Sequence, residues 1–600
     1  MNRTAGGHGH GRLADFTRDG RVLSLAVLAL FVGALSAVIG RLLLYLIGLI
    51  TQLAWYGRVG GELTSPAHHA LGGWAVLVPV AGGLVVGIIA RYGSEKVRGH
   101  GIPEALEAIL IGKSRMEPRV AVLKPLASAV AIGTGGPFGA EGPIIMTGGA
   151  AGSVLAQAFH LSAAERKTLL AAGAAGGMSA IFGTPVAAVL LAVELLLFEW
   201  KPRSFVPVAV ASATAAALRP ALFGPGAMFT VPAHAALSGS GLAIAAVVGL
   251  GAGLAAVLLT VTLYAVEDLF RRLPVHWMWW PALGGLAVGI FGLVDPRVLG
   301  VGYDLIDGLL RGNLVGAAVA GLLVGKALVW TVALASGTSG GVLAPLLIIG
   351  GALGAAVAPW LPVGDPGLWA ALAMAALMGA AMGAPLTALV FMAELTGDAH
   401  LLPGLLVACF AGALVTALLL RRSMLTEKLA RRGHHLTREY VTDPLETTRV
   451  AQVMDPSPAL LPATTTLGQL RARLAAADPA LGGHQGWAVV DAAGSLVGVI
   501  TRGDLHRFAA NDEAPLGDVC SHPALVTHPD ATTHEAVAHM LHADVGRLVV
   551  VDPADPERVV GYFGRSSVLM ARRRWLEEER QRERRWSFGA RSSTRGESAG

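Results

Sequence analysis

Charged side chains are scarce in this sequence. Asp, Glu, Lys and Arg make up only 14% of its 600 residues, whereas an ordinary soluble domain carries roughly a quarter. The deficit lies in residues 22–420, a succession of Ala-, Leu-, Val- and Gly-rich stretches, and the chain turns polar from Arg421 onward. The two compositions predict one polytopic membrane domain followed by a soluble domain.

Cysteines and catalytic patterns are also scarce. The only cysteines, Cys409 and Cys520, do not support a disulfide framework. The membrane part shows no Ser/His/Asp or metal-binding constellation. His534 and His539 in HEAVAH stand five residues apart rather than four, so they do not share a helix face as a zinc site requires. The sequence therefore predicts neither an enzyme nor a metal site, and no required cofactor.

Loop charges indicate the topology. Residues 1–21 form a polar tail, and the apolar run after it is too long for a signal-peptide core, so we expect a retained first helix. Residues 51–73 and 221–240 hold one basic residue between them, Arg58, and would face out, while the basic loops would face in. The net charge of +5 then reflects a multi-pass protein of a bacterial-type inner or plasma membrane with cytoplasmic termini, and does not suggest nucleic acid as a partner.

An internal repeat divides the membrane part. GTPVAAVLLAVEL (183–195) matches GAPLTALVFMAEL (383–395), and GAEGPIIMTGGAAG (139–152) matches GVLAPLLIIGGALG (341–354). One match between Ala/Gly-rich segments arises easily by chance, but two in the same order, at offsets of 200 and 202, do not. We expect two related halves, at about 22–268 and 278–435.

Several apolar runs in these halves are too short to cross the roughly 30 Å hydrocarbon core. Paired broken helices in two related halves indicate a transporter-type site near the midplane. A helix that begins inside the membrane presents unpaired N–H groups and the positive end of its dipole, which together attract an anion. Three such starts are GHGIPEA (99–105), GAEGPI (139–144) and GGVLAPL (340–346).

One carboxylate, Glu141, stands on the second of these breaks. An ionised carboxylate beside helix N-termini would occupy the anion's own place, and a protonated or displaced one would open the path. The alternative is a carboxylate that merely caps a helix. The repeat favours the gate, because Leu343 stands at the matching place in the other half.

The segments GHGIP, GTGGPFGAEGP and GGVLAP, in this order, resemble the three signature segments of the CLC family of chloride channels and chloride/proton exchangers. The resemblance covers about residues 22–435. It implies an all-α polytopic membrane fold with an inverted repeat of broken helices, and a homodimer with one pore per subunit. It also implies that Glu141 is the external gating glutamate. The backbone N–H groups that it assigns to chloride belong to Gly101, Ile102, Val342 and Leu343.

Three side chains of the implied chloride site depart from the family pattern. His100 replaces the usual serine of the first segment; its imidazole suggests pH-sensitive conduction or altered selectivity, unless it is turned out of the path. Leu343 replaces a phenylalanine. Leu425 falls near the pore-lining tyrosine of the last membrane helix, in an alignment that is loose by a residue or two.

A fourth departure concerns proton coupling. Exchangers of the family usually carry a proton-accepting glutamate directly after a more widespread one. Here Glu194 stands for the widespread residue, and Leu195, which cannot carry a proton, stands for the acceptor. Glu194 and Glu199 are the candidates for a proton path; we expect Glu194 rather to serve structure, and Glu199 to be the substitute acceptor. The sequence thus favours a chloride channel, with a chloride/proton antiporter as the alternative.

The polar part contains two similar copies of a strand, helix, strand, strand, helix pattern. They resemble a tandem pair of CBS domains, at about 449–509 and 516–573, after a linker at 436–448 and before a charged helix and tail at 574–600. Such α/β pairs often bind adenine nucleotides through a Thr/Ser-x-x-Asp segment, which would be Thr501 and Asp504; the second copy has Gly564 and Ser567 instead. The alternative is a dimer-stabilising module without a ligand.

Overall fold

The computed structural model describes residues 20–433, 444–482, 485–508, 511–521 and 523–585. The chain forms two compact units, residues 1–438 and 439–600. The predicted tail at 1–21 and linker at 436–448 lie largely outside the described residues, and so does the end of the chain from residue 586.

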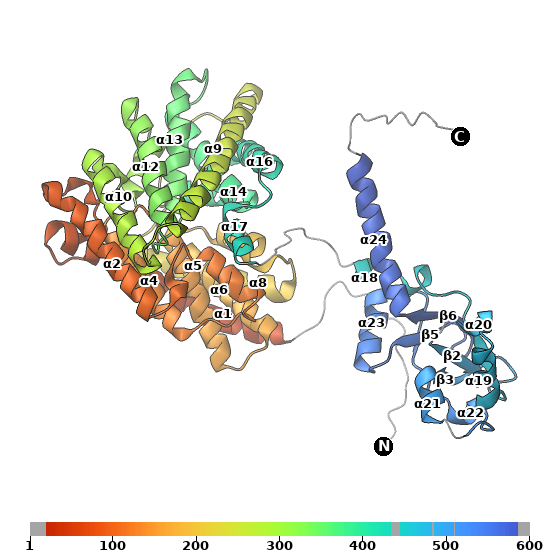
Figure 1. Cartoon of the computed structure of the whole chain (residues 1–600). Coiled ribbons are helices and arrows are strands. Elements are labelled where there is room, and N and C mark those ends of the chain that lie inside the picture. Colours follow the sequence, from red (N-terminus) through yellow and green to blue (C-terminus); the bar gives the residue numbers. More distant parts are fainter. Residues whose placement is uncertain (1–19, 434–443, 483–484, 509–510, 522, 586–600) are drawn as a thin grey trace, which may run out of the picture. The chain divides into compact units, whose positions relative to one another are not determined.

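The described part of the first unit is helical, with two successive series of eight α-helices (Figure 1). The first series is α1 (Arg21–Thr51), α2 (Leu77–Tyr92), α3 (Ile102–Leu110), α4 (Pro118–Gly133), α5 (Glu141–Ala158), α6 (Ala163–Phe182), α7 (Pro185–Leu191) and α8 (Pro202–Phe223). The second is α9 (Gly239–Arg271), α10 (Trp280–Val294), α11 (Tyr303–Leu310), α12 (Ala317–Ala335), α13 (Leu343–Val357), α14 (Pro366–Met382), α15 (Pro385–Thr396) and α16 (Leu402–Leu419). Helix α17 (Met424–Arg431) follows.

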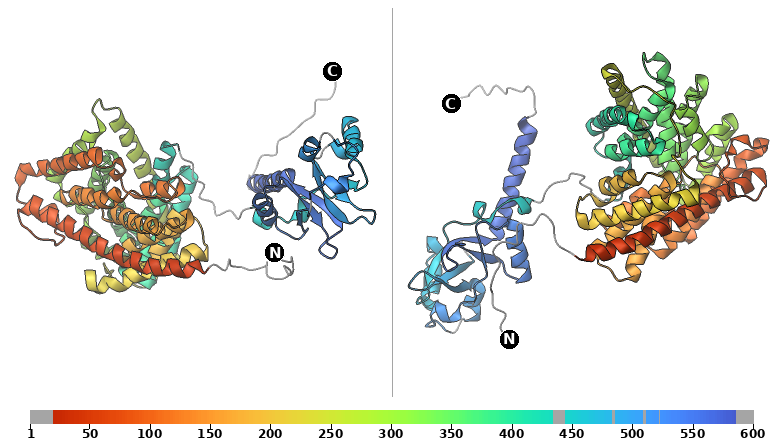
Figure 2. Two further views of the ribbon diagram at one scale, coloured as in Figure 1. Left: turned by 90° about the horizontal axis from the view of Figure 1, so that it is seen from below. Right: turned by 180° about the vertical axis from the view of Figure 1, so that it is seen from behind.

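Eight helical segments of the described chain are long and apolar enough to span a membrane. Others, such as α3, α7 and α11, are far shorter than the roughly 20 residues that a span needs. The helices of the first series lie together below those of the second in Figure 1, and the same division is visible from behind (Figure 2, right). The first unit is therefore a multi-pass membrane domain of full and broken helices, as the sequence predicts.

Matching breaks separate the helices of the two series. Helices α6 and α14 end at Gly183 and Gly383, whose φ angles of 68° and 70° are accessible to glycine at little cost. Two residues later Pro185 and Pro385 begin α7 and α15. Proline lacks the N–H that would be unpaired in the first turn anyway. The GTP and GAP tripeptides of the repeat are therefore helix stop–start signals.

Helices α7 and α15 cap each other across the repeat. Glu194, in the π-helical turn η5 (Ala192–Leu197) that continues α7, accepts hydrogen bonds from Thr387 N (2.9 Å) and Thr387 Oγ1 (2.6 Å). Glu394 accepts them from the N–H groups of Val186 (3.0 Å) and Ala187 (2.9 Å). Each carboxylate thus satisfies the start of the other helix, an exchange that a pseudo-twofold relation between the halves produces.

Two buried lysines repeat in the same way. Lys124 Nζ donates to the carbonyl oxygens of Val97 (2.8 Å) and Gly99 (2.6 Å). Lys326 Nζ donates to those of Val298 (3.0 Å) and Gly300 (3.0 Å). Both lysines are fully buried, so each depends on these carbonyls. Their contacts show that the loop GHGIP (99–103) is equivalent to the loop GVGYD (300–304). This third match between the halves is not evident from residue identities alone.

The second unit contains two three-stranded sheets of identical topology. The first consists of β1 (Leu460–Pro462), β2 (Gly486–Val490) and β3 (Leu496–Thr501), and the second of β4 (Val526–Thr527), β5 (Arg547–Val551) and β6 (Val559–Gly564). In each sheet the first pair is parallel and the second antiparallel, with a register shift near the end of the middle strand. The helices are α18 (Pro444–Thr447), α19 (Leu467–Ala475), α20 (Pro479–Gly482), α21 (Arg502–Arg507), α22 (Leu516–Val519), α23 (Thr533–His542) and α24 (Arg565–Arg585). The predicted α/β repeat is confirmed.

Candidate functional site

The starts of α3, α5 and α13 meet inside the membrane unit. Gly139 and Gly341 exchange two backbone hydrogen bonds (3.2 and 2.8 Å), which join the second loop to the third. A Cβ on Gly142 would overlap the carbonyl oxygen of His100, and one on Gly101 would lie 2.7 Å from the carbonyl oxygen of Gly142. The first loop is therefore packed equally tightly on the second. The convergence that the sequence predicts is confirmed.

These helix starts create an electropositive environment without a full positive charge. Pro103, Pro143 and Pro345 occupy the first turns, where proline leaves no unpaired donor of its own. The other first-turn N–H groups have no acceptor within their helices. The positive ends of three helix dipoles therefore face one small volume, which suits an anion.

The Glu141 side chain lies at this meeting point. It is fully buried, and its carboxylate packs against the Cα atoms of Gly139 and Gly341, where a side chain would not fit. It faces the backbone N–H of Ala344, on α13, and the hydroxyl of Tyr303. Neither carboxylate oxygen has a hydrogen bond of normal geometry to the described residues. The carboxylate therefore faces both its own backbone N–H, at the start of α5, and the start of the neighbouring helix α13.

The four backbone groups assigned to chloride fall in two categories. Ile102, Val342 and Leu343 are buried at or beside the first residues of α3 and α13. The Gly101 N–H, in contrast, donates to Glu104 Oε2 (3.0 Å), a side chain of the first turn of α3. In this conformation the Gly101 N–H is therefore taken by a side chain.

The three substituted side chains lie at different places. The imidazole of His100 is almost entirely buried, and its Nδ1 has no partner in the part of the chain that the structure describes. Leu343 begins α13 beside the glutamate. Leu425 is fully buried on α17, which packs against α3 and α14. Beside it, Tyr264 Oη donates to the carbonyl oxygen of Met424 (2.5 Å).

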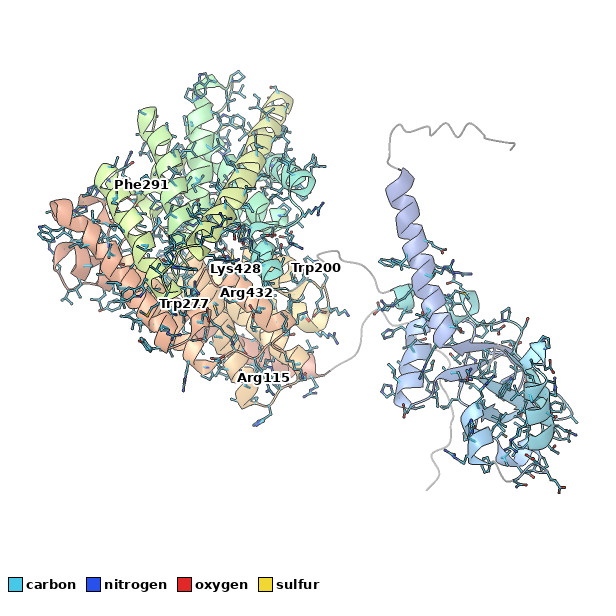
Figure 3. The ribbon with its side chains drawn as sticks, in the orientation of Figure 1. Arg115, Trp200, Trp277, Phe291, Lys428 and Arg432 are labelled. Atoms are coloured by element: carbon cyan, nitrogen blue, oxygen red, sulfur yellow. The ribbon has the colours of Figure 1, made fainter. Side chains whose placement is uncertain are left out.

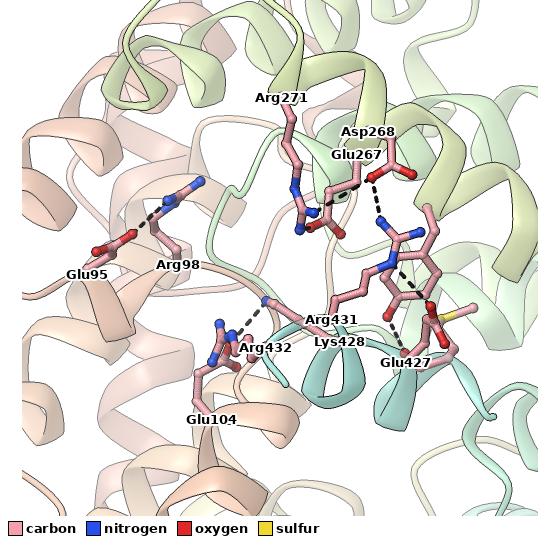
Figure 4. A network of polar contacts seen from close by, with 12 residues as sticks. Glu95, Arg98, Glu104, Glu267, Asp268, Arg271, Glu427, Lys428, Arg431 and Arg432 are labelled. Atoms are coloured by element: carbon pink, nitrogen blue, oxygen red, sulfur yellow. Dashed lines mark hydrogen bonds and ion pairs between the residues drawn. The ribbon is translucent and has the colours of Figure 1, made fainter. Parts of the chain in front are cut away.

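A cavity of about 630 Å³ leads to the first loop from the side of α17. Glu104, which holds the Gly101 N–H, is paired there with Lys428 (3.0 Å) and Arg432 (3.2 Å), as Figure 4 shows. Burial opposes the charge of Arg432, but Glu104 and Glu107 outweigh it and raise the pKa of Arg432 above its usual value. Basic residues outnumber acidic ones in the lining of this cavity, which favours anions. The charged lining residues are Lys96, Arg98, Arg271, Lys428 and Arg432 against Glu95, Glu107 and Glu267.

Aromatic side chains complete this cavity. The guanidinium of Arg98 lies 4.5 Å from the ring centre of Trp277 and 5.7 Å from that of Trp280. Trp277 belongs to the short turn η6 (Trp277–Trp279) and is marked, with Lys428 and Arg432, in Figure 3. Arg98 directly precedes Gly99 of the first loop, so the rings hold a cation beside that loop.

The two glutamates proposed for a proton path are both engaged in local structure. Glu194 caps α15 through Thr387. Glu199 follows η5, accepts a hydrogen bond from Ser204 Oγ (2.7 Å) and lies 3.9 Å from Lys167 Nζ. Leu195, at the place of the family's proton acceptor, is fully buried.

Thr501 and Asp504 lie together at the junction of β3 and α21. Asp504 Oδ2 accepts from Thr501 N (2.9 Å) and Thr501 Oγ1 (2.7 Å). In the second copy the hydroxyl of Ser567 accepts from Gly564 N (3.3 Å), so a hydroxyl replaces the carboxylate. A cavity of about 910 Å³ lies between the copies. It is lined at the two equivalent junctions by Thr501, Arg502, Gly503, Gly564, Arg565, Ser566 and Ser567.

Sequence reasoning missed Tyr303, Lys124 and Lys326. The two lysines are buried and donate hydrogen bonds to loop carbonyl oxygens. The buried hydroxyl of Tyr303 faces Glu141. The sequence indicates the two lysines only through their spacing. Lys124 and Lys326 lie 202 residues apart, and GHG and GVG lie 201 apart, close to the offset of the repeat. The glycines and the lysines together would have revealed the third match.

Comparisons with known proteins agree with this architecture. The family model described as voltage gated chloride channel matches residues 82–417, more than half of the chain, and the CBS domain model matches 450–511 and 516–574. The voltage-gated ClC-type chloride channel ClcB of Salmonella typhimurium is 31% identical over 381 residues, covering 62% of this chain and 90% of the relative. ClcB of Escherichia coli O81 is 29% identical over 393 residues, covering 64% and 93%.

Solved structures show the same fold. A slow cyanobacterial Cl⁻/H⁺ antiporter superposes with a TM-score of 0.61 at 22% identity, covering 69% of this chain and 99% of the other. A eukaryotic CLC transporter gives a TM-score of 0.57 at 19% identity, covering 91% and 98%. With three converging helix starts, an inverted repeat and two α/β copies, this chain belongs to the CLC family of chloride channels and transporters and carries a pair of CBS domains.

Proposed function

We propose that this protein conducts chloride through the meeting point of α3, α5 and α13, and that Glu141 is the gate. The observation that carries the proposal is the buried Glu141 carboxylate, which lies where three helix starts meet and has no normal hydrogen bond to the described chain. A carboxylate placed there competes with an anion for the same donors. Opening then requires that Glu141 be neutralised or moved.

Chloride flux tests this function directly. Liposomes loaded with chloride and containing the purified protein should release chloride when the counter-ion current is provided by valinomycin and potassium. Protein-free liposomes prepared in parallel give the background rate. Release at the background rate, from protein that remains folded in detergent, would contradict the proposal.

We infer that conduction is not coupled to protons. Leu195 cannot carry a proton, and Glu194 is engaged by Thr387. The alternative is a chloride/proton antiporter; Glu199 would be its inner acceptor, and two neighbours of the same fold are named antiporters. A chloride gradient imposed on the liposomes should drive no proton movement. Uphill proton movement at a fixed ratio would establish the antiporter, and loss of that movement in Glu199→Gln would identify the acceptor.

We propose that the cavity between the CBS copies binds an adenine nucleotide. Arg502, Arg547 and Arg565 line it and suit phosphates. ATP, ADP or AMP should raise the melting temperature of the protein, and Asp504→Ala should abolish the rise. Asp530→Ala, at an exposed site of the second copy, is the control and should keep it. The absence of a shift with all three nucleotides would favour the module without a ligand.

We further propose a homodimer with the CBS pair on the cytoplasmic side. The basic loops support this orientation. Light scattering coupled to size exclusion in detergent measures the subunit number, and protease treatment of sealed vesicles reports the side of the CBS pair. A monomer, or cleavage only from the outside, would contradict the respective statement.

A further inference from the structure

Tyr303 occupies a special position in the inverted repeat. The loop before it mirrors the loop of the first segment: Lys326 holds Val298 and Gly300 as Lys124 holds Val97 and Gly99. Gly302, with φ of 78°, is the N-cap residue of α11, and Gly101, with φ of 93°, is the N-cap residue of α3. Tyr303 is therefore the counterpart of Ile102, one of the residues assigned to the anion. The repeat supplies a fourth loop at the site, and this one carries a hydroxyl.

The Tyr303 hydroxyl is buried but has no hydrogen bond of normal geometry to the described residues. It faces the Glu141 carboxylate, whose two oxygens are unpaired in the same sense. Buried phenol groups nearly always find a partner. Buried oxygens that face one another without a hydrogen bond of normal geometry indicate a place where a further donor or acceptor can be accommodated.

The ring of Tyr303 is held in place and reaches a second cavity. Phe182 and Phe229 pack edge-on against it, with ring centres 6.5 and 6.2 Å away. The ring is partly exposed and lines a cavity of about 110 Å³ together with Thr51, Thr64 and Asp304. Residues 51–73 are those that the charge pattern places outside. Tyr303 thus stands between the outer approach and Glu141.

We propose that Tyr303 Oη is a ligand of the outer anion site, and this rests on the proposed function. With the gate closed, the hydroxyl donates towards the Glu141 carboxylate; once Glu141 has left, it donates to the anion in the same place. A phenol has one proton to donate, and hydrogen bonds to charged acceptors are the stronger ones. Leu425 offers no hydroxyl from α17, and the Tyr264 hydroxyl beside it is engaged by the carbonyl oxygen of Met424. The Tyr303 hydroxyl of α11, in contrast, is not so engaged by the described residues. Tyr303 then favours anions that accept strong hydrogen bonds.

Chloride binding tests the ligand role without flux. Glu141→Ala removes the competing carboxylate, and titration calorimetry in detergent then measures chloride affinity. Adding Tyr303→Phe should weaken chloride binding about tenfold, the expected loss of one hydrogen bond to a charge. Tyr56→Phe in the same background is the control: its hydroxyl donates to Ser65 O and does not face Glu141, so chloride affinity should be retained. Equal affinity of the Tyr303→Phe and parent proteins would overturn the proposal.

Selectivity provides a second readout that the amount of folded protein does not affect. In protein with Glu141 intact, Tyr303→Phe should shift the ratio of chloride to nitrate flux several-fold towards nitrate, the weaker hydrogen-bond acceptor. An unchanged ratio would also overturn the proposal. The two failures are distinguishable, because an unsubstituted protein that passes no chloride refutes the proposed function, whereas chloride flux indifferent to Tyr303 refutes only the ligand role.

Discussion

Glu141→Gln should make chloride flux independent of external pH. In the unsubstituted protein, flux should rise as the pH falls, because a protonated carboxylate no longer competes with the anion for the donors at the meeting point. Above the titration of the gate, flux should fall by up to about tenfold per pH unit, since the ratio of neutral to ionised carboxyl changes by that factor. The amide of glutamine has nearly the same shape but cannot ionise, so it leaves the pathway equally open at every pH.

The measurement is the initial rate of chloride release from liposomes at a series of external pH values. Glu62→Gln is the matched control, since Glu62 is an acidic residue of the segment predicted to face out and lies remote in sequence from the meeting point. It should keep the pH dependence of the unsubstituted protein. A pH dependence that survives in Glu141→Gln would remove the gating role from Glu141 and direct attention to His100, the buried imidazole of the first loop.

Much of the fold could be predicted because its breaks are encoded locally. Gly183 ends one helix and Pro185 starts the next, and Gly383 and Pro385 do the same in the second half. The same holds for the starts of α5 and α13. The scarcity of charged residues in 22–420 predicts the membrane domain, and the repeated strand and helix pattern after it predicts the two α/β copies. None of these signals depends on contacts between distant residues.

The parts that could not be predicted depend on such contacts. GVGYD shares only two glycines with GHGIP, and only the hydrogen bonds of Lys124 and Lys326 show that the loops are equivalent. Tyr303 reaches Glu141 across 162 positions of sequence. The capture of the Gly101 N–H by Glu104 is different, because a Glu three residues after a helix start is a local capping signal. The sequence therefore carries this signal at Glu104, without any contact between distant residues.

Gly142→Ala should abolish chloride flux and lower the melting temperature, although helix propensity alone predicts the opposite. Alanine stabilises a helix interior by about 1 kcal/mol relative to glycine, and Gly142 lies within α5. Its added Cβ, however, would overlap the carbonyl oxygen of His100 and lie 3.1 Å from Gly341 Cα. Both neighbours are backbone atoms of the other two loops, so neither can rotate away, and the loops must separate.

The magnitudes decide the sign. One extra carbon in a well-packed interior costs about 1–3 kcal/mol when side chains can adjust, and more where only backbone can yield, so the packing cost exceeds the propensity gain. Gly251→Ala supplies the control: Gly251 lies within α9, and nothing lies within 4 Å of its added Cβ. That substitution should keep the propensity gain, raise the melting temperature slightly and leave flux intact. If both alanines stabilised the protein and preserved flux, the three helix starts would not be packed closely enough to share one anion.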